Sequence, residues 1–232
     1  MPYWRLSSFY FFYFAALGAL VPYWGLYLQS RGFDAVAIGS LMALLMATKI
    51  VAPNVWGWLG DHLGHRMLIV RVASLVTVLA FVNMFWAEGY WGIALVMLGY
   101  SFFWNASLPQ LEVVTFTYLG DKVKRYSLLR LWGSVGFIVT VILLGILLDY
   151  LGTEVILWAV LGMYLGIFLA SLSIKDPAPQ PHPPTQGSIF QVLKQPSILA
   201  FFVAVFLMQA GHGPYYAFYS IYLENHGYTK GS

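Results

Sequence analysis

Charged side chains inside long apolar stretches are the residues of this sequence with the clearest chemical potential: Lys49, Arg71, Glu112 and Arg130. A charge at the centre of a bilayer costs at least ~2.5–3.5 kcal/mol, so such a residue usually faces a cavity and a partner. Ion pairing, binding of a charged solute and proton exchange are the chemistry open to this set. Arg71 lies about one helical turn inside its stretch, so extension of its side chain to the lipid headgroups explains it most simply.

The acid and one arginine of this set lie in consecutive apolar stretches. Asn105 and Glu112 fall on one face of a helix, and Arg130 follows after a short loop, so we expect the two helices to be antiparallel neighbours. The geometry allows a Glu112–Arg130 pair, and Lys49 is another possible partner for Glu112. A static pair that only locks helices together is the alternative. Ionisable residues within membrane spans are functional by default. We therefore predict a solute-binding or proton-coupling site that contains Lys49, Asn105, Glu112 and Arg130.

A later apolar stretch offers a histidine among tyrosines. His212 shares a helical face with Tyr215, Tyr216 and Tyr219. A histidine can change charge near neutral pH, so His212 could relay a proton. The alternative is a neutral imidazole that is hydrogen-bonded to a tyrosine. We add His212 and Tyr216 to the predicted site and keep both interpretations.

A short polar connector carries a second pattern. It reads GWLGDHLGHR (57–66), with Gly57, Asp61, Gly64 and Arg66 at characteristic spacing. Glycines allow a tight turn and a close approach of helices. An aspartate there can accept hydrogen bonds from a helix N-terminus or an arginine, and a basic residue marks the cytoplasmic side. These four residues are the predicted conformational-switch loop.

The composition shows what must position these residues. Of 232 residues, 60% are hydrophobic and only 9% charged, whereas a soluble domain carries about 25% charged residues. Most of the surface must therefore face lipid. The basic residues are scattered, which argues against a nucleic-acid partner. The chain has no cysteine, and its histidines lie apart except for His62 and His65, so we expect no metal site and no cofactor.

Seven apolar stretches reach the ~20 residues that a helix needs to cross the hydrocarbon core. They are residues 8–28, 36–58, 67–87, 91–117, 127–148, 154–174 and 197–223. Short polar connectors separate the first six. The sixth connector is long, and its prolines (PAPQPHPPTQ) favour extended, solvated chain.

The distribution of Lys and Arg predicts the orientation, because cytoplasmic loops are enriched in both. With the N-terminus inside, the inner segments carry Arg5, Arg66, Lys122, Lys124, Arg125, Lys175 and Lys194, and the outer ones carry Arg31 and Lys230. This bias predicts a cytoplasmic N-terminus.

An internal repeat relates the first stretch to the seventh. A shift of 195 residues places Gly18 on Gly213 and Gly32 on Gly227, and aligns YLQSRGF with YLENHGY. The repeat predicts that a second bundle begins at about residue 197. The chain ends where the second helix of that bundle would begin, so we expect an incomplete product.

Several of these segments carry a family resemblance. The 57–66 loop, the Pro109–Glu112 stretch, RLWGSVGF (130–137) and QAGHGPYYAFYSIYLENHGY (209–228) resemble the phenylpropionate permease-like branch of the major facilitator superfamily. This branch is related to lactose permease and nucleoside–proton symporters. The resemblance implies an all-α membrane protein with the major facilitator fold. Its complete N-terminal six-helix bundle would be residues 1–174, followed by a cytoplasmic Pro-rich linker (175–196) and the first helix of a truncated C-terminal bundle (197–232).

The resemblance also implies a function. We expect a secondary active transporter that takes up an aromatic acid, sugar or nucleoside together with H⁺ by alternating access. Its acid–arginine pair would be Glu112 and Arg130. The expected setting is a monomer among the lipids of a bacterial inner membrane. The alternative is an intramembrane enzyme of the acyl- or glycosyltransferase type, but the sequence lacks the catalytic cluster that such an enzyme needs.

Overall fold

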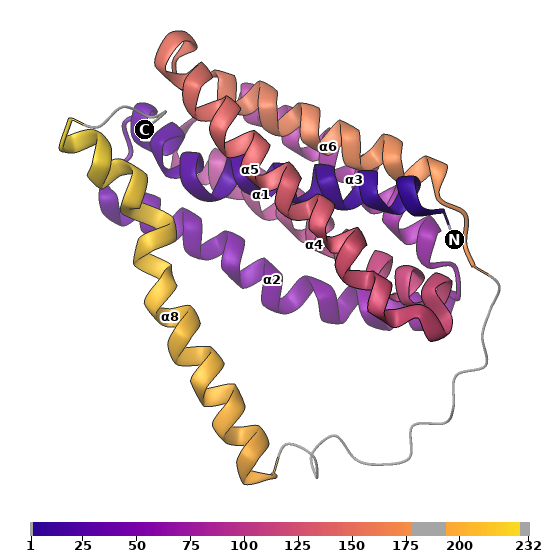
Figure 1. The fold of residues 1–232 in the computed structure, drawn as a ribbon. Helices are drawn as coiled ribbons and strands as arrows, with labels where there is room; N and C mark the ends of the chain where they lie inside the picture. Colours follow the sequence, from indigo (N-terminus) through magenta and orange to yellow (C-terminus); the bar gives the residue numbers. More distant parts are fainter. Residues whose placement is uncertain (1, 178–193, 228–232) are drawn as a thin grey trace.

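The computed structural model describes residues 2–177 and 194–227, and the regular elements in these ranges are helical. They are α1 (Tyr3–Ser30), α2 (Ala35–Leu63), α3 (Arg66–Val82), the 3₁₀ turn η1 (Asn83–Phe85), α4 (Gly89–Leu119), the 3₁₀ turn η2 (Gly120–Arg125), α5 (Tyr126–Leu151), α6 (Val155–Ser173) and α8 (Pro196–Asn225), shown in Figure 1. Six helical runs are long and apolar enough to cross a membrane. One of these runs, Gly89–Leu151, contains both α4 and α5, so seven helices of membrane length are described.

Helix α1 lies at the centre of the bundle and packs against α5 and α6, while α4 packs against α2 and α3. Glycines bring α5 close to α1. A Cβ at Gly133 would lie 2.6 Å from the ring of Phe14, and one at Gly136 would collide with the backbone of Phe11. We expected α4 and α5 to pack as neighbours because a short loop joins them. That expectation is wrong, since α5 makes far more contact with α1 than with α4.

Helices α1 and α8 end with the same local geometry. Gly32 and Gly227 have φ values of +85° and +81°, a region that favours glycine. The N–H of Gly32 donates to the carbonyl oxygen of Gln29 at 2.9 Å, and that of Gly227 donates to Glu224 at 3.0 Å. Each residue of the second pair lies 195 positions after its counterpart, which is the shift of the sequence repeat. The shared ending supports the repeat.

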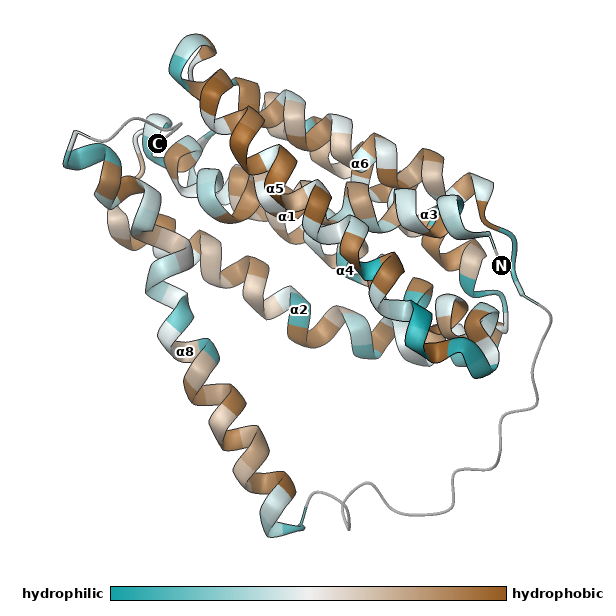
Figure 2. Ribbon diagram, viewed as in Figure 1, coloured by the Kyte–Doolittle hydropathy of each residue, from teal (hydrophilic) through white to brown (hydrophobic). Residues whose placement is uncertain are grey.

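The helices are apolar along most of their length, as Figure 2 shows by hydropathy, and many of their apolar side chains are exposed. On α5, for example, Ile138, Ile142 and Ile146 recur at helical spacing and are exposed. Such a stripe would be unfavourable in water and is suited to lipid. Helix α8 lies against α1 and α2 and is otherwise exposed. Its contact with α1 is close, because a Cβ at Gly25 would lie 2.7 Å from the carbonyl oxygen of Ala217.

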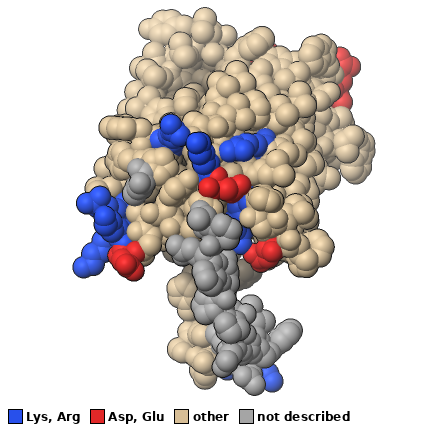
Figure 3. Space-filling view, turned by 90° about the vertical axis from the view of Figure 1, so that its right-hand side faces the viewer, with Lys and Arg blue, Asp and Glu red and all other residues tan. Residues whose placement is uncertain are grey.

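Basic residues gather at one end of the bundle. Arg5 of α1 donates to the carbonyl oxygen of Ser173 at 3.0 Å, and Tyr118 of α4 donates to Lys175 at 2.8 Å. The N-terminus, the α4–α5 junction and the end of α6 therefore lie together, and Figure 3 shows Lys and Arg side chains on this end. This is the end that the sequence assigns to the cytoplasm.

Candidate functional site

The α2–α3 loop is built around Arg66. Its guanidinium pairs with Asp61, and its Nη1 donates to Oε1 of Gln110 on α4 at 2.6 Å. The amide nitrogen of Gln110 donates to the carbonyl oxygen of Trp56 at 2.8 Å. Gly64 ends α2 in the left-handed region with a φ of +68°. The predicted switch residues thus join three helices.

Two residues of this network were missed by sequence reasoning, and one was misjudged. Gln110 is buried and supplies the α4 side of the network. Gly60 provides the close approach, because a Cβ there would collide with Gln110 and Arg66. Gly57, which we expected to allow close helix packing, has no atom within 4 Å of its ideal Cβ position. The motif spacing identified the loop but could not show which glycine packs inward.

A second set of hydrogen bonds holds the C-terminal end of α6. Arg71 donates to the carbonyl oxygens of Ser171 and Ile174 at the C-terminal end of α6. Asp176 accepts a hydrogen bond of 2.9 Å from the backbone N–H of Met67 and caps the start of α3. A carboxylate at a helix N-terminus is favourable, and cations are favoured at a C-terminus. Arg71 of α3 and Asp176, which follows the end of α6, therefore satisfy backbone groups at the ends of α6 and α3 respectively.

Glu112 and Arg130 lie in one aromatic environment but form no direct ion pair within the described residues. Tyr126 donates a hydrogen bond of 2.9 Å to Oε1 of Glu112. The Arg130 guanidinium lies 4.0 Å from the centre of the Phe14 ring and 5.9 Å from that of Tyr10. Tyr10 in turn contacts Tyr126 edge-on at 6.4 Å. The two charges are thus bridged by rings of α1 and α5.

One atom of Arg130 stands out. Its Nη1 is buried and has no hydrogen-bond partner among the described residues. Leaving a buried charged donor unpaired is costly, although cation–π contact with Phe14 offsets part of the cost. A hydrogen-bond acceptor such as a carboxylate would satisfy this donor. The arrangement is therefore suited to a change of partner.

Asn105 and Lys49 lie apart from this pair of charges. Asn105 is buried and donates to the carbonyl oxygen of Ser101 at 2.8 Å and to Oγ1 of Thr48 at 3.2 Å. It thereby joins α4 to α2, as polar side chains do between membrane helices. Lys49 lines a small hollow beside Asn105 and makes no ion pair with Glu112 in the described structure. The predicted site is therefore divided between two places.

His212 of α8 lies outside the bundle interior. His212 is exposed, and its Nδ1 is 2.7 Å from the carbonyl oxygen of Met208. Tyr215 and Tyr219 stack with ring centres 4.6 Å apart. The side chain of Tyr216 lies outside the described residues. The described residues contain no group of three or more His, Cys, Asp or Glu side chains that could hold a metal ion.

Comparison with known proteins decides the family. The model of the MFS_1-like family matches residues 3–232. The chain belongs to the MFS_1-like family. It is therefore a multi-pass membrane protein of a transporter family and not an enzyme, so the alternative of an intramembrane transferase is set aside.

The relatives of this MFS_1-like chain include proteins that are named for different substrates. It is 29% identical over 231 residues to the probable 3-phenylpropionic acid transporter of Escherichia coli (strain K12), covering 95% of this chain and 59% of the relative. It is 28% identical over 203 residues to the maltose permease of Geobacillus stearothermophilus, covering 86% and 51%. The crystal structure of the nucleoside transporter NupG matches with a TM-score of 0.70 at 18% identity, covering 90% and 53%.

These matches confirm the major facilitator fold that the sequence resemblance implied. The chain spans about half the length of the relatives that it matches. The comparisons do not assign a substrate, since the named relatives differ in theirs.

Proposed function

We propose that this protein takes part in proton-coupled uptake of a small organic solute across a bacterial inner membrane, with its N-terminus in the cytoplasm. Glu112 is the proton-exchanging group, and Arg130 is its counter-charge. Alternating access follows when protonation of Glu112 changes the interactions that bridge α4, α5 and α1 and so biases the bundle between two states. The transported solute and the proton are the partners.

The observation that carries the proposal is the unpartnered, buried Nη1 of Arg130 in the same aromatic environment as Glu112. Opposite charges within membrane spans usually pair, and pairs of this kind mark proton and substrate pathways. Here Tyr126 occupies the carboxylate while the guanidinium lies over Phe14. A protonated Glu112 would lose its charge attraction to Arg130, and an ionised one would regain it. The geometry therefore supports two alternative states of one pair.

The orientation is supported by the basic residues that gather at one end of the bundle. One end of the bundle is where α1 begins and α6 ends. This end carries Arg5, Arg66 and the basic residues of η2. An excess of Lys and Arg on the cytoplasmic side sets topology. An N-terminal fusion to green fluorescent protein should fluoresce, and a fusion to alkaline phosphatase at the same site should be inactive. The reverse pattern would contradict the orientation.

Uptake in right-side-out vesicles tests the coupling role. Vesicles with an imposed proton gradient should accumulate labelled solute, chosen by screening aromatic acids, maltosides and nucleosides. Glu112→Gln should abolish accumulation against a gradient, and Arg130→Ala should do the same. The exposed residues Glu88 and Arg125 provide matched controls, since Glu88→Gln and Arg125→Ala remove the same charges outside the spans. Unimpaired coupled uptake in both Glu112→Gln and Arg130→Ala would disprove the proposal.

A further inference from the structure

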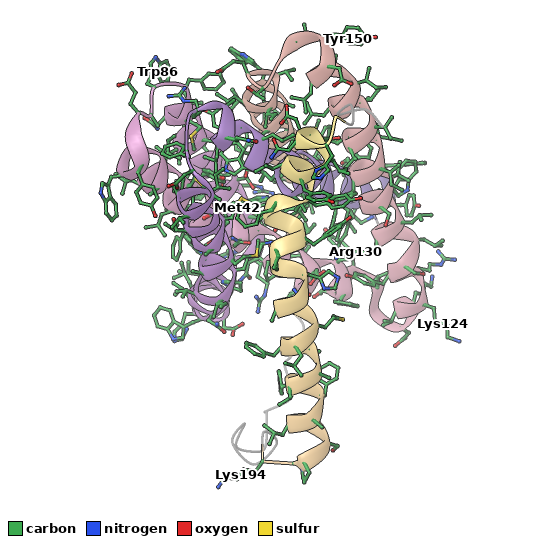
Figure 4. The ribbon with its side chains drawn as sticks, turned by 90° about the vertical axis from the view of Figure 1, so that its left-hand side faces the viewer. Met42, Trp86, Lys124, Arg130, Tyr150 and Lys194 are labelled. Atoms are coloured by element: carbon green, nitrogen blue, oxygen red, sulfur yellow. The ribbon has the colours of Figure 1, made fainter. Side chains whose placement is uncertain are left out.

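The 3₁₀ turn η2, which joins α4 to α5, carries three closely spaced cations. Lys122, Lys124 and Arg125 are exposed, and their side chains make no ion pair or hydrogen bond with the residues that the structure describes. The turn also contains one carboxylate, Asp121, so positive charge is in excess. Figure 4 shows Lys124 at the outer edge of the bundle. The turn therefore presents cations that an external anion can reach.

The arginines elsewhere at this end of the bundle already have protein acceptors. Arg5 and Arg71 donate to carbonyl oxygens at the end of α6, and Arg66 pairs with a carboxylate of its own loop. An excess of Lys and Arg on one side of a membrane is general, so the presence of cations at this end does not by itself indicate a site. The cations of η2 differ because they remain available to a ligand.

An exposed apolar face of α5 begins directly after these cations. It consists of residues that recur at helical spacing and are exposed, namely Leu128, Leu131, Val135, Ile138 and Ile142. The face runs for about 21 Å along the helix, whereas the hydrocarbon of one leaflet is about 15 Å thick. A ligand that follows this face therefore needs a long apolar chain, with its charged group at η2.

Two tryptophans mark the depth at which this face begins. Nε1 of Trp132 donates to Oη of Tyr3 at 2.9 Å, and the ring of Trp4, which is 68% exposed, lies 5.5 Å from that of Trp132. Tryptophan and tyrosine favour the border between hydrocarbon and headgroups. The Tyr3 hydroxyl also donates to the carbonyl oxygen of Leu128, three residues after Arg125. Three residues span about 4.5 Å of helix, and the headgroup layer is about 5–8 Å thick, so the cations lie at the depth of the headgroups.

Cations at headgroup depth above an apolar face match one kind of ligand. An anionic phospholipid carries a phosphate and long apolar chains in this order, and basic clusters beside membrane helices attract such headgroups. We propose that η2 and the start of α5 bind an anionic phospholipid, with its phosphate on Lys122, Lys124 and Arg125 and an acyl chain along α5. A zwitterionic lipid adds an ammonium that these cations repel, so the site selects for headgroup charge. The assignment does not depend on the proposed transport function.

Quenching of tryptophan fluorescence by brominated lipid tests the assignment. The natural gene product is reconstituted into phosphatidylcholine nanodiscs with increasing mole fractions of phosphatidylglycerol, and one of the two lipids is brominated high on one acyl chain. The part of the quenching that disappears in Trp4→Phe reports lipid at this site. Brominated phosphatidylglycerol should cause this part at a lower mole fraction than brominated phosphatidylcholine. The preference should fall at about 1 M salt, where the Debye length is ~3 Å.

Substitutions then identify the cations. Each Lys or Arg near an anionic surface corresponds to about a fivefold gain in affinity. Lys124→Gln should therefore lower the preference for phosphatidylglycerol about fivefold, and glutamine at all three positions should lower it on the order of a hundredfold. Lys124→Arg should preserve it. The matched control is Lys194→Gln, because Lys194 is also exposed and lies well apart from Lys124 in Figure 4. This control should keep the wild-type preference.

Several outcomes would overturn the assignment. They are equal quenching of wild type by the two brominated lipids, an unchanged preference in Lys124→Gln, an equal loss in Lys194→Gln, and a preference that persists undiminished in Trp4→Phe. Displacement of phosphatidylglycerol by inorganic phosphate would also overturn it, because the cations would then bind a free anion. An unchanged melting midpoint of every variant in pure phosphatidylcholine ensures that a lost preference reports the site.

Discussion

The contact between α5 and α1 depends on the absence of a side chain at Gly136. A Cβ there would lie 3.0 Å from the carbonyl carbon of Phe11 and 3.1 Å from its Cα, whereas carbon atoms prefer ~3.5–4.0 Å. Because the obstructing atoms are backbone, the helices must separate by roughly 0.5–1 Å, which forfeits about a quarter to a half of the local dispersion attraction. Overpacking of this kind costs about 1–3 kcal/mol. Gly136→Ala should lower the midpoint of thermal unfolding by about 2–12 °C for a domain of this size.

Intrinsic tryptophan fluorescence measures this midpoint in a fixed detergent, because the chain contains nine tryptophans and no cysteine for thiol dyes. The matched control is Gly162→Ala on α6, where no atom lies within 4 Å of the ideal Cβ position. Alanine is favoured over glycine in a helix by about 0.5–1 kcal/mol, so this variant should melt at or above the wild-type temperature. If Gly136→Ala melts no lower than Gly162→Ala, the α1–α5 contact is not as close as described.

Substitutions at three further positions test individual contacts by the same thermal measurement. Gln110→Leu leaves Nη1 of Arg66 without its 2.6 Å partner and should cost about 1–3 kcal/mol, whereas Gln110→Glu keeps an acceptor and should cost less. Asp176→Ala removes the side chain that caps α3 and should cost about 0.5–2 kcal/mol. Gly32→Ala forces a side chain into the left-handed region at a φ of +85° and should cost about 1–2 kcal/mol. A wild-type midpoint in any of these would contradict the contact or conformation on which it rests.

Much of the fold could be predicted because its signals are local. The apolar stretches approximate the seven membrane-length helices, and the 195-residue repeat anticipated the matching ends of α1 and α8. The same holds for Asp61 and Arg66, which pair across the short loop that the sequence pattern identified. Each of these features depends on residues that are close in the sequence.

The arrangement of the helices could not be predicted in this way. A membrane helix is apolar on its lipid face and on its packing face alike, so periodicity does not show which side is buried. Asn105 illustrates the consequence, because its spacing placed it beside Glu112, whereas its hydrogen bonds join it to Thr48 on α2. Likewise, a short loop suggested that α4 and α5 pack together, but α1 is the main partner of α5.

The central position of α1 connects helix packing with the proposed chemistry. The ring of Phe14 fills the space that Gly133 leaves on α5, and the same ring lies under the guanidinium of Arg130. Tyr126, at the start of α5, holds the carboxylate of Glu112 on α4. Tyr126 and Arg130 both lie in the first turns of α5, so a change in the charge of Glu112 would act on this part of the helix. A shift of α5 on α1 would also change the contact between Arg130 and Phe14. Under the proposed function, protonation of Glu112 would therefore act on helix movement through the side chains that also make the close contact between α1 and α5.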